Sequence, residues 1–348
     1  MSTNTSGRIL SLAKRAFDRY LVKAMSGMAL GLFASVIVSV LIAQLARIPI
    51  PGFTLLADFA AAIGAASPVV GAAIGVGIAH SLGHRTLVML SAAACGAYGY
   101  AMGGPLGAYF AAVAGAEVGG LVSGRTRLDI VLVPLTTIIP GSLVGFLVGP
   151  GVQSVMTGLG RFINWATEQR PLPMGILVSV VFGLVLVSPI SSAALAITLN
   201  LSGLAAGAAL AGCSAQMAGF ALTSFPENRW DGFFAQGLGS AKLQLPNIMR
   251  RPVILLPTLL GSAVTGALST VAFRLETVAQ GAGMGNCGLV GPITAFTTMA
   301  DTRGAGETLL AILMVCFVLP TLLALPVSIW MRRKNLIRDG DMTLHLTK

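Results

Sequence analysis

Apolar stretches long enough to cross a lipid bilayer recur along this 348-residue chain. A helix of about 20 apolar residues spans a hydrocarbon core of about 30 Å. Charged residues make up 10% of the sequence, whereas a soluble domain has about 25%. The sequence therefore predicts an all-α polytopic membrane protein, with about ten transmembrane helices and one or two re-entrant hairpins. The stretches behind this prediction are 25–46, 57–79, 129–149, 252–273 and 308–330.

Basic residues gather at the edges of the first and last apolar stretches, and the formal net charge is +10. Cytoplasmic flanks of membrane spans are enriched in Lys and Arg, so we expect a multi-pass plasma (inner) membrane protein with both termini in the cytoplasm. This distribution accounts for the charge without a nucleic-acid partner. The flanking residues are Arg8, Lys14, Arg15, Arg19, Lys23, Arg332, Arg333, Lys334 and Arg338.

The cysteine and histidine positions do not indicate a metal or cofactor site. The four cysteines lie in apolar or glycine-rich stretches without CxxC pairing. His80 and His84 lie four residues apart at an expected turn, without a carboxylate or cysteine close in sequence. We therefore expect no metal, no cofactor and no catalytic residue. Glu117, in AAVAGAEVGG, faces either the interior of the helix bundle or the membrane surface.

The pattern along the chain predicts five parts. Residues 8–21 place apolar side chains on one helical face, which fits a basic amphipathic helix on the inner leaflet or a simple topology signal. Gly103, Gly104 and Pro105 divide 86–122 into two short spans or a re-entrant hairpin. The expected parts are a cytoplasmic amphipathic helix (1–24), a membrane scaffold and dimerisation half (25–150), an interfacial amphipathic linker helix (151–170), a transport half (171–330) and a cytoplasmic tail (331–348).

A polar segment at 223–251 interrupts the apolar second half, since residues 171–226 contain no Asp, Glu, Lys or Arg. Glu227 follows the helix-breaking Pro226, and ionisable groups near the bilayer usually line a ligand or ion path. Glu227 could instead lie in a solvated loop, and Asn247 could be a helix cap. The candidate substrate-binding residues are Glu227, Asn228, Gln244 and Asn247 in this polar segment, and Asn286 in the glycine run 281–291.

Three motifs in the second half resemble a known family. These are Ser224-Phe225-Pro226-Glu227-Asn228, the element from Arg251 to Pro257, and GAGMGNCGLVGPITAF. They are similar to motifs of the membrane subunit (IIC) of the sugar phosphotransferase system, glucose superfamily. AQGLG, LQLPNI and GAGMGNCGLVG resemble a divergent stand-alone branch, related to a regulator of the perfringolysin O toxin.

The resemblance implies a homodimer whose second half carries two re-entrant hairpins and moves a sugar or another small polar solute by an elevator-like shift. It also implies a separate soluble IIB subunit as partner, because the chain shows no IIA or IIB domain of its own. Pro226 precedes the glutamate, whereas the family's proline follows it, and no histidine occurs between His84 and His345. A phosphotransferase subunit and a ligand-sensing regulator without flux therefore stand beside a transporter as alternatives.

Overall fold

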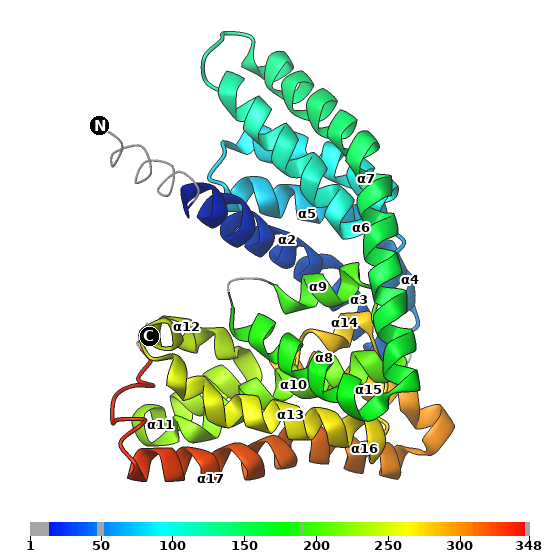
Figure 1. The fold of residues 1–348 in the computed structure, drawn as a ribbon. Helices are drawn as coiled ribbons and strands as arrows, with labels where there is room; N and C mark the ends of the chain where they lie inside the picture. The colour runs from blue at the N-terminus through cyan, green and yellow to red at the C-terminus, as the bar shows by residue number, and fades with distance from the viewer. Residues whose placement is uncertain (1–13, 47–51, 189–190, 345–348) are drawn as a thin grey trace, which may run out of the picture. The chain divides into compact units, whose positions relative to one another are not determined.

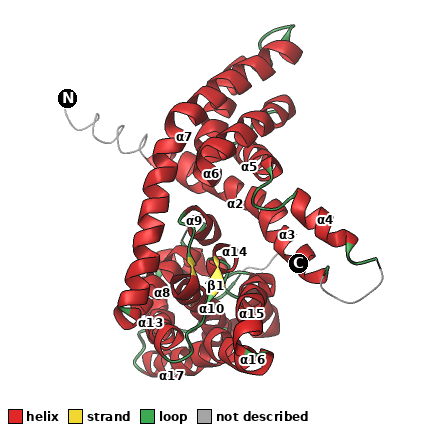
Figure 2. Ribbon diagram, turned by 90° about the vertical axis from the view of Figure 1, so that its right-hand side faces the viewer, coloured by secondary structure: helices red, strands yellow, loops and turns green. Residues whose placement is uncertain are grey.

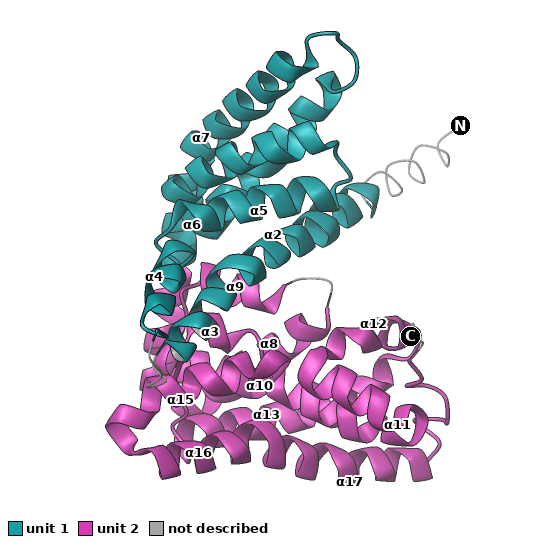
Figure 3. Ribbon diagram, turned by 180° about the vertical axis from the view of Figure 1, so that it is seen from behind, with its two compact units in different colours: residues 1–157 teal, residues 158–348 magenta. Residues whose placement is uncertain are grey.

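The computed structural model describes residues 14–46, 52–188 and 191–344 (Figure 1). Helices dominate these residues, and their one named strand is β1 (Thr277–Val278), which forms antiparallel bridges with Ser202 and Gly203 (Figure 2). The chain divides into two compact units, residues 1–157 and 158–348 (Figure 3). The all-α prediction is confirmed; the roles assigned to the five parts stay predictions.

Unit 1 opens with an unbroken helical run from Lys14 to Leu45. The amphipathic helix expected within 1–24 is thus continuous with the first span from Lys14 onward, and its residues 1–13 lie outside the described residues. The elements are η1 (Phe17–Ala24), α2 (Met25–Leu32), η2 (Phe33–Ile37), α3 (Val38–Leu45), α4 (Leu55–Ala62), α5 (Pro68–Ser81), α6 (Thr86–Val122) and α7 (Asp129–Gln169), whose last turns belong to unit 2.

The single span expected at 57–79 is wrong. Helix α4 ends at Ala62 and α5 begins only at Pro68. Proline lacks the N–H that a helix interior needs for its hydrogen bond, but it is suited to the first turn, where that bond is absent. The Ser67 side chain accepts a hydrogen bond from the main-chain N–H of Val69 at 3.2 Å and so caps the new helix.

Helix α6 turns back on itself at Gly103 and Gly104, whose backbone angles are not helical. A Cβ added to Gly99 would meet the carbonyl oxygen of Gly107 at 2.5 Å, so the two arms lie side by side. Small residues permit such close helix packing in a membrane. The glycine pair therefore makes a helical hairpin, and whether its arms cross the bilayer stays a prediction.

We predict that Gly104→Ala destabilises unit 1 by about 1–3 kcal/mol, the usual cost of a side chain in a sparsely allowed region. Gly104 has φ 58° and ψ −151°, which only glycine adopts readily. The measurement is the thermal unfolding midpoint in detergent. Gly151→Ala is the matched control, because Gly151 is helical with open space around its Cβ position, and its midpoint should hold or rise.

Unit 2 is built around α10, in which every residue except Gly203 and Leu222 is buried. Helices α8, α13 and α17 pack around it (Figure 1). The elements are α8 (Pro171–Val187), α9 (Ser192–Thr198), α10 (Gly203–Thr223), α11 (Phe225–Phe234), η3 (Ala235–Gly239), η4 (Ala241–Gln244), α12 (Leu245–Arg250), η5 (Pro252–Leu255), α13 (Leu256–Val271), β1, α14 (Ala279–Ala282), η6 (Cys287–Leu289), α15 (Val290–Arg303), α16 (Ala305–Leu313), η7 (Met314–Val318) and α17 (Leu319–Arg333).

Six helices among the described residues are long and apolar enough to span a membrane, and two shorter apolar helices accompany them. The expected total of about ten stays a prediction.

Helix α7 runs unbroken through Pro150, so the linker expected at 151–170 continues the preceding helix. The short helix α14 leads into the glycine run 281–291 and contacts α9, where Ser192 Oγ donates to the Gly283 carbonyl at 2.7 Å.

Candidate functional site

Glu227 and Asn228 lie between two interruptions of the helical backbone at the end of α10. Helix α10 ends at Thr223, and α11 starts at Phe225. Four residues later Arg229 adopts φ 51° and ψ −149°, outside the helical region. A helix break at Glu227 was expected, but Pro226 lies in the first turn of α11 and does not end α10.

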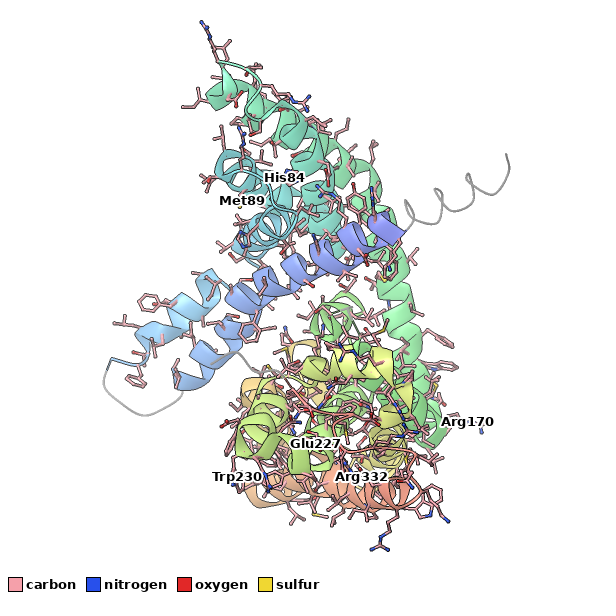
Figure 4. The ribbon with its side chains drawn as sticks, turned by 90° about the vertical axis from the view of Figure 1, so that its left-hand side faces the viewer. His84, Met89, Arg170, Glu227, Trp230 and Arg332 are labelled. Atoms are coloured by element: carbon pink, nitrogen blue, oxygen red, sulfur yellow. The ribbon has the colours of Figure 1, made fainter. Side chains whose placement is uncertain are left out.

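The Glu227 carboxylate forms an ion pair with Arg332 of α17 (Figure 4). Arg332 Nη2 lies 2.7 Å from Oε1 and 3.0 Å from Oε2 of Glu227, and it also donates to the Thr223 carbonyl at 3.0 Å. The Glu227 side chain is 8% exposed and that of Arg332 is 18% exposed. The solvated-loop interpretation is therefore wrong for Glu227, although neighbouring Arg229 and Trp230 are exposed.

The amide side chains of the polar segment form one hydrogen-bonded chain. Asn247 Nδ2 donates to Gln244 Oε1 at 2.8 Å. Gln244 Nε2 donates to Gln236 Oε1 at 2.9 Å, and Gln236 Nε2 donates to Ser224 Oγ at 2.9 Å. Gln236, Gln244 and Ser224 are completely buried. A satisfied buried network of this kind holds its side chains in fixed positions.

The segment Ile337–Leu344, here called the C-terminal strap, packs on these amides. The Met342 carbonyl accepts hydrogen bonds from Asn228 Nδ2 at 2.8 Å and Gln244 Nε2 at 3.0 Å. The Thr343 carbonyl accepts from Asn247 Nδ2 at 2.9 Å, and the Leu344 N–H donates to Asn228 Oδ1 at 2.7 Å. The strap thus forms hydrogen bonds with three of the candidate side chains, Asn228, Gln244 and Asn247.

Asn286 has different contacts from the other four candidates. Its Oδ1 accepts from Ser214 Oγ at 2.9 Å, its Nδ2 donates to the Cys316 carbonyl at 2.8 Å, and the residue is completely buried. It lines a largely apolar cavity of about 410 Å³, together with Phe233 and Gly237 of the polar segment. Cα atoms of η3 and η6 come within 8 Å, so the polar segment and the glycine run approach each other.

A second cavity of about 410 Å³ lies beside the strap. Lys242, Asn247 and Arg250 line it together with Thr343. Burial lowers the pKa of Lys242 from its ordinary value, and the nearby Cys213 raises it by a smaller amount. The rest of the lining is apolar, so this cavity places two basic side chains and an amide beside a mainly apolar wall.

Sequence reasoning left Arg332, Gln236 and Gln216 out of the candidate residues, although Gln236 belongs to the polar segment that it singled out. Arg332 was interpreted only as a topology marker. Gln216 is completely buried in α10, where its Oε1 accepts from Thr258 Oγ1 at 2.7 Å and its Nε2 donates to Ser262 Oγ at 3.1 Å. An amide inside a stretch of small apolar residues is a signal that could have singled out Gln216.

Glu117 of unit 1 accepts a hydrogen bond from Arg19 Nε at 2.7 Å, and His84 Nε2 lies 4.0 Å from its other oxygen. The Glu117 side chain is 30% exposed.

In the described part of the chain, no group of three or more His, Cys, Asp or Glu side chains is arranged to hold a metal ion.

The fold and site define a polytopic helical membrane protein with a polar cluster at a helix break. The family model for the phosphotransferase system, EIIC, matches residues 22–344. The chain therefore belongs to this family, which supports sugar transport and a place in the plasma membrane. Searches of curated proteins and of solved structures found no significant match.

Proposed function

We propose that this chain transports a small polar solute, a sugar, and belongs to the glucose superfamily in the branch related to the perfringolysin O regulator. The motifs around Glu227 and the glycine run support this finer placement. The observation that carries the proposed site is the set of Glu227, Asn228, Gln244 and Asn247 at the end of the buried helix α10.

These side chains match the hydrogen-bonding needs of a sugar. Each hydroxyl donates one hydrogen bond and accepts up to two. The Glu227 carboxylate accepts, the amides of Asn228, Gln244 and Asn247 do both, and Arg332 donates. Hydrogen bonds to charged groups are the stronger ones, so the carboxylate is expected to contribute most to affinity. Asn286 would approach the solute from the glycine run, as the second part of the site.

An elevator-like movement accounts for the division of the chain. Unit 1 would form the scaffold of a homodimer, and unit 2 holds all five candidate residues and would move with the solute. The basic residues after α17, on the same segment as the strap, support a cytoplasmic position for this end of unit 2. The amphipathic last turns of α7 would connect the two units.

We predict that Glu227→Gln lowers solute uptake into proteoliposomes by about 10- to 100-fold, because hydrogen bonds to a charged acceptor contribute about 1.5–3 kcal/mol. Uptake of radiolabelled hexoses, pentoses and hexitols would be measured. Glu307→Gln, at an exposed position in α16, is the matched control and should transport like wild type. Equal uptake by Glu227→Gln and wild type for every transported solute would remove Glu227 from the site.

Coupling of transport to phosphorylation is the second candidate function, and the family match favours it. A separate soluble IIB subunit would then phosphorylate the imported sugar. Reconstitution with candidate IIA and IIB proteins and phosphoenolpyruvate would yield sugar phosphate inside the vesicles. Accumulation of unmodified sugar would indicate uncoupled transport, and binding without accumulation would indicate a ligand-sensing regulator.

A further inference from the structure

The strap holds its position through main-chain groups. Consecutive residues Met342, Thr343 and Leu344 present a carbonyl, a carbonyl and an N–H to the three amide side chains. These groups are two acceptors and one donor, and the hydroxyl groups of a polyhydroxylated solute can supply both kinds. The strap therefore satisfies the amides in the same way that the proposed solute would.

Side-chain contacts fix the register of the strap. Met342 is completely buried, and Thr223 Oγ1 lies 3.9 Å from its sulfur. Ile337 is 2% exposed at the start of the strap. Between them, Asp341 pairs with Arg251 at 3.5 Å and accepts from the Arg338 N–H at 2.8 Å. A shift by one residue would remove Met342 from its buried position.

The contacts that hold the strap are few. Apart from Ile337 and Met342, most strap residues are exposed or only half-buried, including Arg338 and Asp339. Its polar links to the rest of unit 2 are hydrogen bonds to three amide side chains and two ion pairs, Asp341 with Arg251 and Asp339 with Arg332. Such a segment can be released while the helices of unit 2 stay packed.

We propose that the strap is an autoinhibitory segment that competes with the solute for Asn228, Gln244 and Asn247. This inference rests on the proposed solute site. Solute can be held by these amides only when the strap is released. The apparent association constant for the solute is therefore the intrinsic constant multiplied by the fraction of molecules in which the strap is released. Weakening the strap without touching the amides raises affinity and uptake.

The test uses the full-length protein in proteoliposomes, with radiolabelled D-glucose, D-xylose and D-mannitol as probes. Met342→Ser removes the buried anchor, and Asp341→Asn weakens the link to Arg251 by an independent change. Both should raise the initial uptake rate at low solute concentration by about threefold or more. Leu336→Ser, at an exposed position just before the strap, is the matched control and should leave uptake unchanged.

A second measurement follows the strap directly. The rate of maleimide labelling at Thr343→Cys, in a Cys287→Ser background, should rise with Met342→Ser and with a saturating concentration of a transported probe. Cys95, Cys213 and Cys316 are buried and should label slowly. Uptake that is measurable but equal in wild type and both strap variants would overturn the autoinhibitory role alone. No uptake of any probe by wild type or by the strap variants would count against both the transport function and the competition.

Discussion

Arg332→Gln should lower the unfolding midpoint of the protein more than any other single charge change in unit 2. The substitution leaves the Glu227 carboxylate, 8% exposed, without its charged partner. Removing one member of a buried ion pair usually costs about 3–5 kcal/mol, because the remaining charge stays out of water. The partial exposure of Arg332 places the expected loss toward the lower end of that range.

A double substitution separates loss of the charge pair from loss of packing. Glu227→Gln combined with Arg332→Gln removes both charges and should recover most of the lost stability. Arg333→Gln is the matched control, because Arg333 is the exposed neighbour of Arg332 on α17. Midpoints would be measured by scanning fluorimetry in detergent. If the double variant is no more stable than Arg332→Gln alone, the ion pair does not explain the role of Arg332.

The class of the fold could be predicted from sequence because long apolar stretches have few structural solutions in a bilayer. Local breaks were harder to place. The turn before Pro68 was missed, because the residues on both sides of it are apolar and together have the length of a single membrane span. The interruption at Gly103 and Gly104 was expected, because glycine pairs followed by proline interrupt helices.

The polar site was predicted only in part for a different reason. Glu227, Asn228, Gln244 and Asn247 stand out as polar residues between apolar stretches, and the structure does bring them to one end of unit 2. Their partners in the strap are main-chain groups, which every residue carries and which no residue pattern indicates. Arg332 has a visible charge, yet a basic residue after a span has a topological explanation that hides its pairing.

Gly212→Val should prevent unit 2 from folding, because helices α8 and α10 cross at this residue. A Cβ on Gly212 would overlap the main-chain carbonyl of Ser179, an obstacle that no side-chain rotation can remove. Overpacking in a tight core costs about 1–3 kcal/mol, and more where backbone must move. We expect loss of monodisperse protein on size-exclusion chromatography in detergent.

Substitutions at two other glycines are expected to have smaller effects on folding. Gly306→Val in α16 should be tolerated, since nothing lies within 4 Å of its Cβ position. Gly219→Ala in α10 would meet a side-chain methyl of Thr258 at 2.8 Å, which can move, so its midpoint should fall only modestly. A Gly212→Val protein as stable as Gly306→Val would show that α8 and α10 do not pack as described.

The same crossing connects helix packing to the candidate site. Ser214, two residues after Gly212, donates to Asn286, and Gln216 bonds Ser262 and Thr258 of α13. Separation of α10 from α8 would shift these donors relative to their partners. The milder Gly212→Ala should therefore weaken solute uptake beyond its effect on the folded fraction. Gly306→Ala is the control, because nothing lies within 4 Å of its Cβ position, and it should lower uptake only in proportion to folded protein. Uptake normalised to monodisperse protein distinguishes the two results.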